Sequence, residues 1–166
     1  TPGVDVRHIS SVVRNKVRKG QCDLVIIDYL QLVETPQSYS NKNREREVAE
    51  ISRGLKKAAK AAGVPIILLA QLNRAIENRE DKTPRLADLR ESGAIEQDAD
   101  IVIFPWRPAY YDPNSLDEHG NSLQKVMMFE IAKNRDGRTG SIPSKHNDDL
   151  TQFFDYNTKQ FETPIF

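Results

Sequence analysis

The sequence has 166 residues, which is enough for one compact domain with its own hydrophobic core, so we start from one domain and not two. Hydrophobic residues make up 38% of the sequence, and 24 basic side chains balance 24 acidic ones, which excludes a protein that coats nucleic acid through bulk positive charge. No apolar run approaches the roughly 20 residues that span a bilayer. The single cysteine, Cys22, excludes an internal disulfide framework and favours the cytoplasm.

The first element predicted along the chain is a helix over roughly residues 5–19. Asp5 can cap its start, Gly20 can end it, and apolar residues recur between them at helical spacing. These apolar residues are Val6, Ile9, Val13 and Val17. A short run rich in β-branched residues follows at 23–28 and ends at Asp28, which predicts a parallel strand buried on both faces.

Residues 34–43 are rich in serine and asparagine and contain a proline, which indicates an exposed loop. A second helix is predicted over 44–62, where apolar residues form a stripe and Gly63 supplies a stop. The stripe consists of Val48, Ile51, Leu55, Ala58 and Ala62. The helix leads into a second apolar strand at 66–70, and a strand, a long helix and a strand in this order predict a βαβ unit with a parallel pair.

After this unit, residues 71–83 are polar and predict a loop of weak structure. Thr83 and Pro84 resemble a cap followed by proline at the first helical position, so we expect a short helix from there to residue 90. A short turn after Gly93 leads to a third buried strand at 101–104.

The last part of the chain predicts a long surface loop at 107–124 and a fourth strand at 126–133. Residues 134–137 then form a turn, and the chain returns as a hairpin around 140–142. A last strand is expected within 151–156.

Two polar residues stand where chemistry is expected in such a sheet. Asp28 and Gln71 each follow a strand of the predicted parallel pair, and ligands collect beyond the carboxyl ends of parallel strands. A carboxylate there can hold Mg²⁺, usually through water, and an amide can orient a water molecule or sense a terminal phosphate. Capping of the next segment by Asp28 and satisfaction of loop backbone by Gln71 remain open as structural alternatives.

Two further segments have basic residues or a glycine at positions that could bind an anion. Lys133 and Arg135 lie at the end of a strand in the one locally basic stretch, so a hairpin tip can present them to an anion of another molecule, or they are ordinary charges of a solvated turn. Arg90 and Gly93 lie in a stretch where backbone N–H groups can approach phosphates, although a polar connection explains the same residues.

Four segments together resemble the DnaB-type replicative DNA helicases. The segment LVIIDYLQL, residues 24–32, resembles the family's Walker B segment, and AQLNR, residues 70–74, resembles its sensor-glutamine motif. The segment DLRESGAIEQDAD, residues 88–100, resembles its DNA-loop motif, and KNRDG, residues 133–137, resembles its trans-acting arginine finger. The four occur in the family's order.

The resemblance implies an α/β fold, a partial RecA-like P-loop NTPase with a parallel sheet core and a C-terminal antiparallel hairpin. Residues 1–166 would be the downstream part of the C-terminal ATPase domain of a hexameric replicative helicase. Such a helicase uses ATP and Mg²⁺ to unwind duplex DNA with 5′–3′ polarity at the replication fork. The implied partners are single-stranded DNA, further copies in a homohexamer, a primase and a helicase loader, in the cytoplasm and without a membrane.

The resemblance also implies roles for individual residues on the nucleotide side. Asp28 would position Mg²⁺, and Gln71 would sense the γ-phosphate and relay its state to the DNA loops. Arg135 would be the finger inserted into the neighbouring subunit's site, with Lys133 beside it on the same phosphates.

On the DNA side, Arg90, Glu91 and Gly93 would contact the DNA backbone in the central channel, Gly93 through its N–H. A phosphate-binding loop of the form GxxxxGK(S/T) does not occur in the sequence, and in the family it lies upstream of the matched part. We therefore expect that this polypeptide alone neither binds nor hydrolyses ATP appreciably.

Two alternatives remain open at the level of the sequence. One is a RecA-like ATPase of recombination or repair that is not a helicase. The other is a truncated module that only docks on a hexamer or on a loader.

Overall fold

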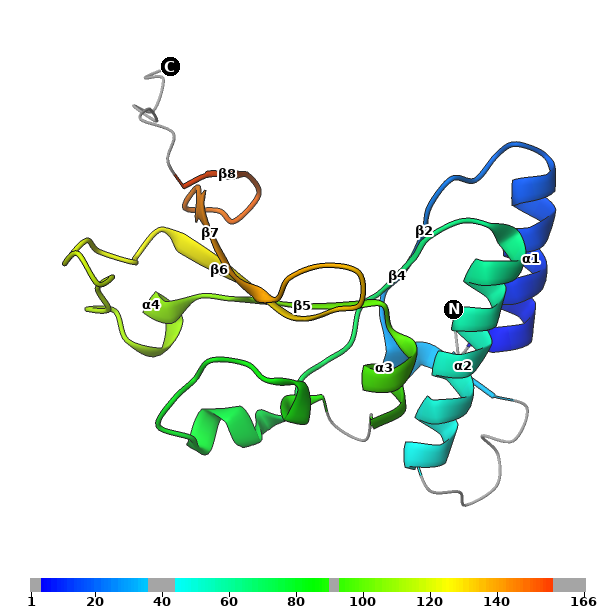
Figure 1. Cartoon of the computed structure of the whole chain (residues 1–166), viewed down its shortest axis with the longest axis horizontal. Helices are drawn as coiled ribbons and strands as arrows, with labels where there is room; N and C mark the ends of the chain where they lie inside the picture. Colours follow the sequence, from blue (N-terminus) through cyan, green and yellow to red (C-terminus); the bar gives the residue numbers. More distant parts are fainter. Residues whose placement is uncertain (1–3, 36–43, 90–92, 157–166) are drawn as a thin grey trace. The chain divides into compact units, whose positions relative to one another are not determined.

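The computed structural model describes residues 4–35, 44–89 and 93–156 (Figure 1). The chain divides into two compact units. The first consists of Thr1–Asn78 with Arg85–Asp100, and the second of Arg79–Pro84 with Ile101–Phe166. No helix in the described part of the chain is long and apolar enough to cross a membrane. The expectation that all 166 residues form part of one ATPase domain stays a prediction.

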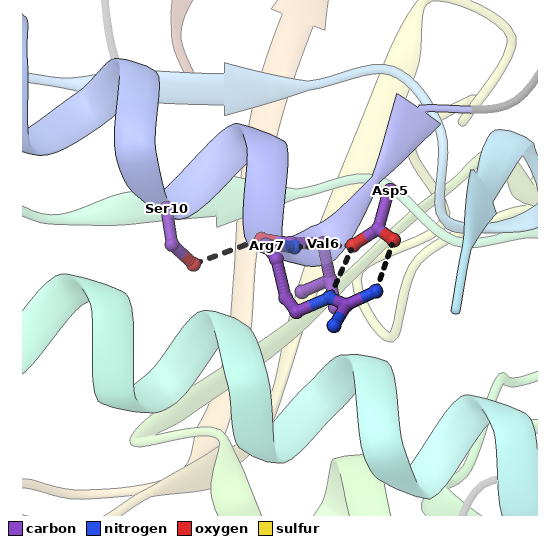
Figure 2. Close-up of polar contacts among 4 residues, drawn as sticks. All are labelled: Asp5, Val6, Arg7 and Ser10. Atoms are coloured by element: carbon purple, nitrogen blue, oxygen red, sulfur yellow. Dashed lines mark hydrogen bonds and ion pairs between the residues drawn. The ribbon is translucent and has the colours of Figure 1, made fainter. Parts of the chain in front are cut away.

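The first unit begins with strand β1 (Val4–Asp5) and helix α1 (Val6–Arg18), which confirms the predicted first helix. The Asp5 carboxylate accepts the backbone N–H of Arg7 at 2.7 Å, which lowers the pKa of Asp5, and the Arg7 guanidinium returns to the same carboxylate (Figure 2). At the other end Gly20 has φ +64° and donates its N–H to the carbonyl of Val17, a C-terminal motif that favours glycine. Both predicted helix ends are therefore confirmed.

The predicted βαβ unit is also confirmed. Strand β2 (Val25–Ile27) pairs in parallel with β4 (Ile66–Leu68), and Val25 lies opposite Ile66. Helix α2 (Arg44–Ala62) connects the two strands and has the predicted bounds. Gly63 follows it with φ +70° and donates its N–H to the carbonyl of Ala59, which ends the helix.

The core of the first unit lies between the two helices and one face of this strand pair. Ile51 of α2 is fully buried at its centre, and Ile27 and Leu68 of the strands pack against the cluster. The buried residues of the cluster are Val6, Leu30, Val33, Val48, Ile51, Leu55 and Ile95.

The prediction that the strand at 23–28 is buried on both faces is wrong, and the second strand of the pair also has an exposed face. Ile26 and Ile67 lie opposite each other and are 63% and 47% exposed. Successive side chains of a strand point to opposite faces, and α1 and α2 pack against the face of Ile27 and Leu68. Each strand is therefore buried only on the face that the two helices cover.

The predicted loop at 34–43 is partly wrong. After the 3₁₀ helix η1 (Leu30–Leu32), strand β3 (Val33–Glu34) pairs in parallel with β1, and Thr35 is buried. The rest of this predicted loop, residues 36–43, lies outside the described residues.

The described residues between 71 and 100 form more helical structure than predicted. They contain the 3₁₀ helices η2 (Arg74–Asn78) and η3 (Leu86–Asp88) and helix α3 (Gly93–Asp98). Thr83 and Pro84 do not open a helix, because Arg85 is still extended and donates its N–H to the Asp88 carboxylate. Helical structure therefore starts at Leu86.

The second unit is an antiparallel sheet of four strands in the order β5-β6-β7-β8. These strands are β5 (Ile101–Trp106), β6 (Val126–Asn134), β7 (Gly140–His146) and β8 (Phe153–Asp155). The predicted hairpin and last strand are thereby confirmed.

The third predicted strand is only half-buried, because β5 exposes one face. Val102 and Phe104 are buried, whereas Ile101 and Ile103 point to the exposed face. The surface loop predicted at 107–124 begins instead with the short helix α4 (Pro108–Tyr111).

Candidate functional site

The structure brings Asp28 and Gln71 to the same end of the parallel pair. Ile27 lies opposite Leu68, so Asp28 follows β2 at the level of Leu69, and Leu30 donates its N–H to the Leu69 carbonyl at 2.8 Å. Gln71 comes two residues after Leu69, and both Asp28 and Gln71 are exposed. The two residues therefore lie where parallel sheets bind their ligands.

Gln71 lines an open cavity of about 440 Å³ in the first unit. The residues around it are Leu30, Gln31, Arg44, Val48, Gln71, Leu72 and Arg74. Arg44 and Arg74 both line this cavity. The Arg44 guanidinium is paired with the Glu47 carboxylate, so an anionic group bound here would compete with Glu47 for Arg44, whereas Arg74 has no acidic partner among the described residues. Neither arginine could be assigned to the site from the sequence, because the two are distant in sequence and only the pairing of β2 with β4 brings their segments together.

The surroundings of Asp28 fit a magnesium site of the kind that a nucleotide completes. In the described part of the chain, no three His, Cys, Asp or Glu side chains gather as a metal site. Asp28 would therefore belong to a site with at most two such ligands among the described residues, and Mg²⁺ is commonly bound by one or two carboxylates together with substrate phosphates and water.

A backbone hydrogen bond joins the segment after Gln71 to the start of the DNA-loop segment. Asn73 donates its N–H to the Asp88 carbonyl at 2.9 Å. Asp88 is itself fixed, because its side chain is buried and accepts the N–H of Arg85 at 2.7 Å. One direct backbone hydrogen bond therefore joins the segment after Gln71 to Asp88.

Of the three predicted DNA-contact residues, only Gly93 lies in the described part of the chain. Arg90 and Glu91 lie outside the described residues. Gly93 is exposed and is the first residue of α3, which packs against α2, with Ile95 buried in the core of the first unit. A Cβ added at Gly93 would meet no atom within 4 Å, so no described neighbour requires glycine at this position.

Lys133 and Arg135 belong to the second unit, whereas Asp28, Gln71 and Gly93 belong to the first. Lys133 lies on β6 opposite Val102, and Arg135 is exposed in the turn that follows the strand. The turn is compact, because a Cβ added at Gly137 would lie 2.4 Å from the side-chain nitrogen of Asn134. The structure therefore places both basic residues at the hairpin tip, as predicted.

The sequence analysis did not identify two further features of the second unit. Arg107 lies over the ring of Tyr110 at 5.5 Å, and both residues line a cavity of about 410 Å³. The second feature is Asp117, where two N–H groups of Asn121 hold the pKa of the carboxyl at about 2. Asp117 also accepts the hydroxyl of Tyr156, and burial together with this bond raises the pKa of Tyr156.

Comparison with known proteins gives consistent matches over most of the chain. The family model of the DnaB-like helicase C terminal domain matches residues 1–155. The replicative DNA helicase DnaB of Rickettsia conorii is 38% identical over 98% of this chain and 35% of its own length. The replicative DNA helicase DnaC of Bacillus subtilis is 44% identical over 86% of this chain and 30% of its own length. The chain therefore spans about a third of the curated relatives that it matches.

Two solved structures match with a TM-score of 0.81, 41% sequence identity and coverage of 92% of this chain. One is a DnaB-like replicative helicase described with its interactions with primase, of which 36% is covered. The other is described as an ATPase domain, of which 52% is covered. Both agree with the α/β fold of parallel strands followed by an antiparallel sheet.

Proposed function

Because the chain belongs to the DnaB-like helicase C-terminal domain family, we propose that it serves a hexameric replicative helicase that unwinds duplex DNA with 5′–3′ polarity, driven by ATP hydrolysis. The observation that carries the proposal is the placement of Asp28 and Gln71 at the carboxyl end of one parallel pair. The relatives compared are replicative helicases, so a recombination or repair ATPase is the less favoured alternative.

On the nucleotide side, Asp28 holds the metal through its carboxylate or through a bound water. When bound, Mg²⁺ neutralises phosphate charge and orients the phosphate oxygens. Gln71 senses the terminal phosphate through its amide. Lys133 and Arg135 act on the phosphates of the neighbouring subunit, where a guanidinium stabilises charge that develops in the transition state.

On the DNA side, Arg90, Glu91 and Gly93 contact the backbone of single-stranded DNA. The bond from Asn73 to Asp88 supports a mechanical link between the two sides, because it joins the segment after Gln71 to the segment that leads to these residues. The hexamer works in the cytoplasm, and we propose a primase and a helicase loader as its protein partners. One of the matching solved helicases is described with primase.

A graft tests the proposal. Residues 1–155 replace the matching segment of the Bacillus subtilis relative, and ATP hydrolysis and unwinding of a forked DNA are measured. We expect an active hexamer, a loss of ATPase activity of at least about 100-fold in Asp28→Asn, and a comparable loss in Arg135→Ala.

Mixing provides the matched control for a role in trans. Hexamers mixed from Arg135→Ala subunits and from subunits without the phosphate-loop lysine should regain part of the activity. A graft that assembles as a hexamer but hydrolyses no ATP would contradict the proposal, and the absence of recovery in every mixture would contradict the role of Arg135.

A further inference from the structure

Helix α1 and the residues that follow it concentrate positive charge in a protein whose net charge is zero. From Val6 to Cys22 the sequence has five arginine and lysine residues and no aspartate or glutamate. All five are exposed, and they are Arg7, Arg14, Lys16, Arg18 and Lys19. The overall balance of charge therefore hides a local surface of one sign.

Three of these residues form a row. Arg7, Arg14 and Arg18 are spaced by seven and four positions, so at 3.6 residues per turn they lie within about 40° of one another around the helix. The row is about 16 Å long at a rise of 1.5 Å per residue. The buried side of the helix, with Val6 and Val13, points elsewhere.

Two of the three guanidinium groups have no acidic partner in the described part of the chain. Arg7 is paired with Asp5 at 3.3 Å, as Figure 2 shows. The side chain of Arg14 donates to the backbone carbonyl of Ser10, and Arg18 forms no ion pair with a described residue. Arg14 and Arg18 can therefore bind an external anion without breaking an ion pair.

Helix α2, which packs beside α1, carries further exposed charge of the same sign. Val6 packs against Gly54, and Figure 1 shows α1 and α2 running side by side in the same direction. From Ile51 to Ala62, α2 has no acidic residue. Lys57 and Lys60 are exposed and form no ion pair with a described residue. We call the row of three arginines with Lys57 and Lys60 the basic face.

The basic face is separate from the DNA-contact segment at Gly93. Helix α3, which begins at Gly93, packs against α2, and α1 packs against α2 as well. Figure 1 shows α1 and α3 on opposite sides of α2. Helix α2 therefore lies between α3 and the arginines of α1.

We propose that the basic face binds the phosphate backbone of single-stranded DNA without regard to sequence, as a second contact besides the one at Gly93. Arginine and lysine side chains with unengaged charge supply the sequence-independent part of nucleic-acid binding. A protein partner fits this face less well, because stable protein interfaces have an apolar centre. On α1, all of which is described, Val12 is the one exposed large apolar side chain.

The test measures binding of the whole chain to a fluorescent single-stranded oligonucleotide over a range of salt concentrations. Each phosphate contact contributes about 0.7 to the slope of log affinity against log salt. The double variant Arg14→Gln/Arg18→Gln should therefore lower the slope by about 1.4 and the affinity in 0.1 M salt by roughly 20-fold. The same change should appear in an Arg90→Ala background, because the two contacts are separate.

Two matched variants control for charge and for folding. Arg14→Lys/Arg18→Lys keeps the charge and should retain most of the affinity. Arg46→Gln/Lys125→Gln removes the same charge from exposed residues outside the basic face and should change the affinity by less than about threefold. Circular dichroism should give the same helix content for all three double variants, and a loss of helix confined to the glutamine pair on α1 would contradict our placement of both arginines on an exposed face.

Several results would overturn the proposal. One is an unchanged affinity and slope in Arg14→Gln/Arg18→Gln, and another is an equal loss in the Arg46→Gln/Lys125→Gln control. If Arg14→Gln/Arg18→Gln no longer lowered the affinity in the Arg90→Ala background, Arg90 and the two arginines of α1 would belong to one DNA site. Tighter binding of polyglutamate than of DNA through the same arginines would assign the face to an acidic protein instead.

Discussion

Asp28 and Gln71 lie at the same end of a parallel strand pair, because Val25–Ile27 pairs with Ile66–Leu68. Helix α2 lies between these two strands in the sequence. Lys133 and Arg135, in contrast, lie on a hairpin whose two strands are neighbours in sequence. The first arrangement depends on a core assembled from several distant segments, and the second depends on a turn and on cross-strand pairs. A core substitution should therefore affect the first edge, and a turn substitution should affect the hairpin alone.

The largest expected effect is on the core of the first unit. Replacing the fully buried Ile51 with alanine should lower the free energy of unfolding by about 2–5 kcal/mol, through lost burial and the cavity that remains. Urea denaturation followed by circular dichroism measures this. The control Ile26→Ala removes an exposed isoleucine and should cost much less, and equal losses in the two variants would contradict our view of the core.

The next effect concerns the hydrogen-bonded link between the segment after Gln71 and Asp88. Asp88→Ala removes the buried acceptor of the Arg85 N–H and should cost about 1–3 kcal/mol. Hydrogen exchange should become faster at the amides of Arg85 and Asn73, whereas Asp88→Asn keeps an acceptor and should change them less. Unchanged protection of both amides in Asp88→Ala would show that Asp88 does not fix this segment.

A smaller and local effect is expected at the hairpin. In Gly137→Ala the new methyl group meets the Asn134 side chain, whose flexible end can move, so we expect a cost of about 1 kcal/mol. NMR shifts should change over residues 133–138 and not in α2. The double variant Asn134→Ala/Gly137→Ala removes the clash and should restore most of the loss, and no restoration would point to backbone strain instead.

The smallest effect is acid loosening of the loop around Asp117. Its pKa is lowered from 3.8 to about 2 in the folded protein, so its contribution to stability is present above pH 3.8 and is lost as the pH falls toward 2. The Tyr156 hydroxyl should then donate to a neutral and weaker acceptor, which an NMR titration of residues 117–121 and 156 detects. In Asn121→Ala the transition should move to higher pH, and an identical titration would refute the assigned cause.

Local signals in the sequence predicted some elements well. The bounds of α2 follow from its apolar stripe and from Gly63, and both ends of α1 follow from Asp5 and Gly20. The hairpin follows from the turn residues before Gly140. In each case the deciding residues lie within or beside the element itself.

Features decided by distant residues were not predicted. The later start of the helical turn after Thr83 was also missed, although it depends on a local contact, the Arg85 N–H donated to the Asp88 carboxylate three residues further on. The exposure of Ile26 and Ile67 depends on which face the helices cover. For the candidate site, the edge position of Asp28 and Gln71 was predicted from strand order, whereas Arg44 and Arg74 beside Gln71 required the fold.

The pairing of the strands also bears on the order of folding. Each strand of the sheet β5-β6-β7-β8 pairs with the next strand in sequence. The pairing of β2 with β4, in contrast, joins two strands that are separated in the sequence by β3 and the whole of α2. Contacts between distant residues form more slowly, because the entropy of closing a long loop is lost before the contact is gained. In pulse-labelled hydrogen exchange, amide protection should therefore appear between β6 and β7 before it appears between β2 and β4. The hairpin with Arg135 would then be formed while the edge with Asp28 and Gln71 is still incomplete.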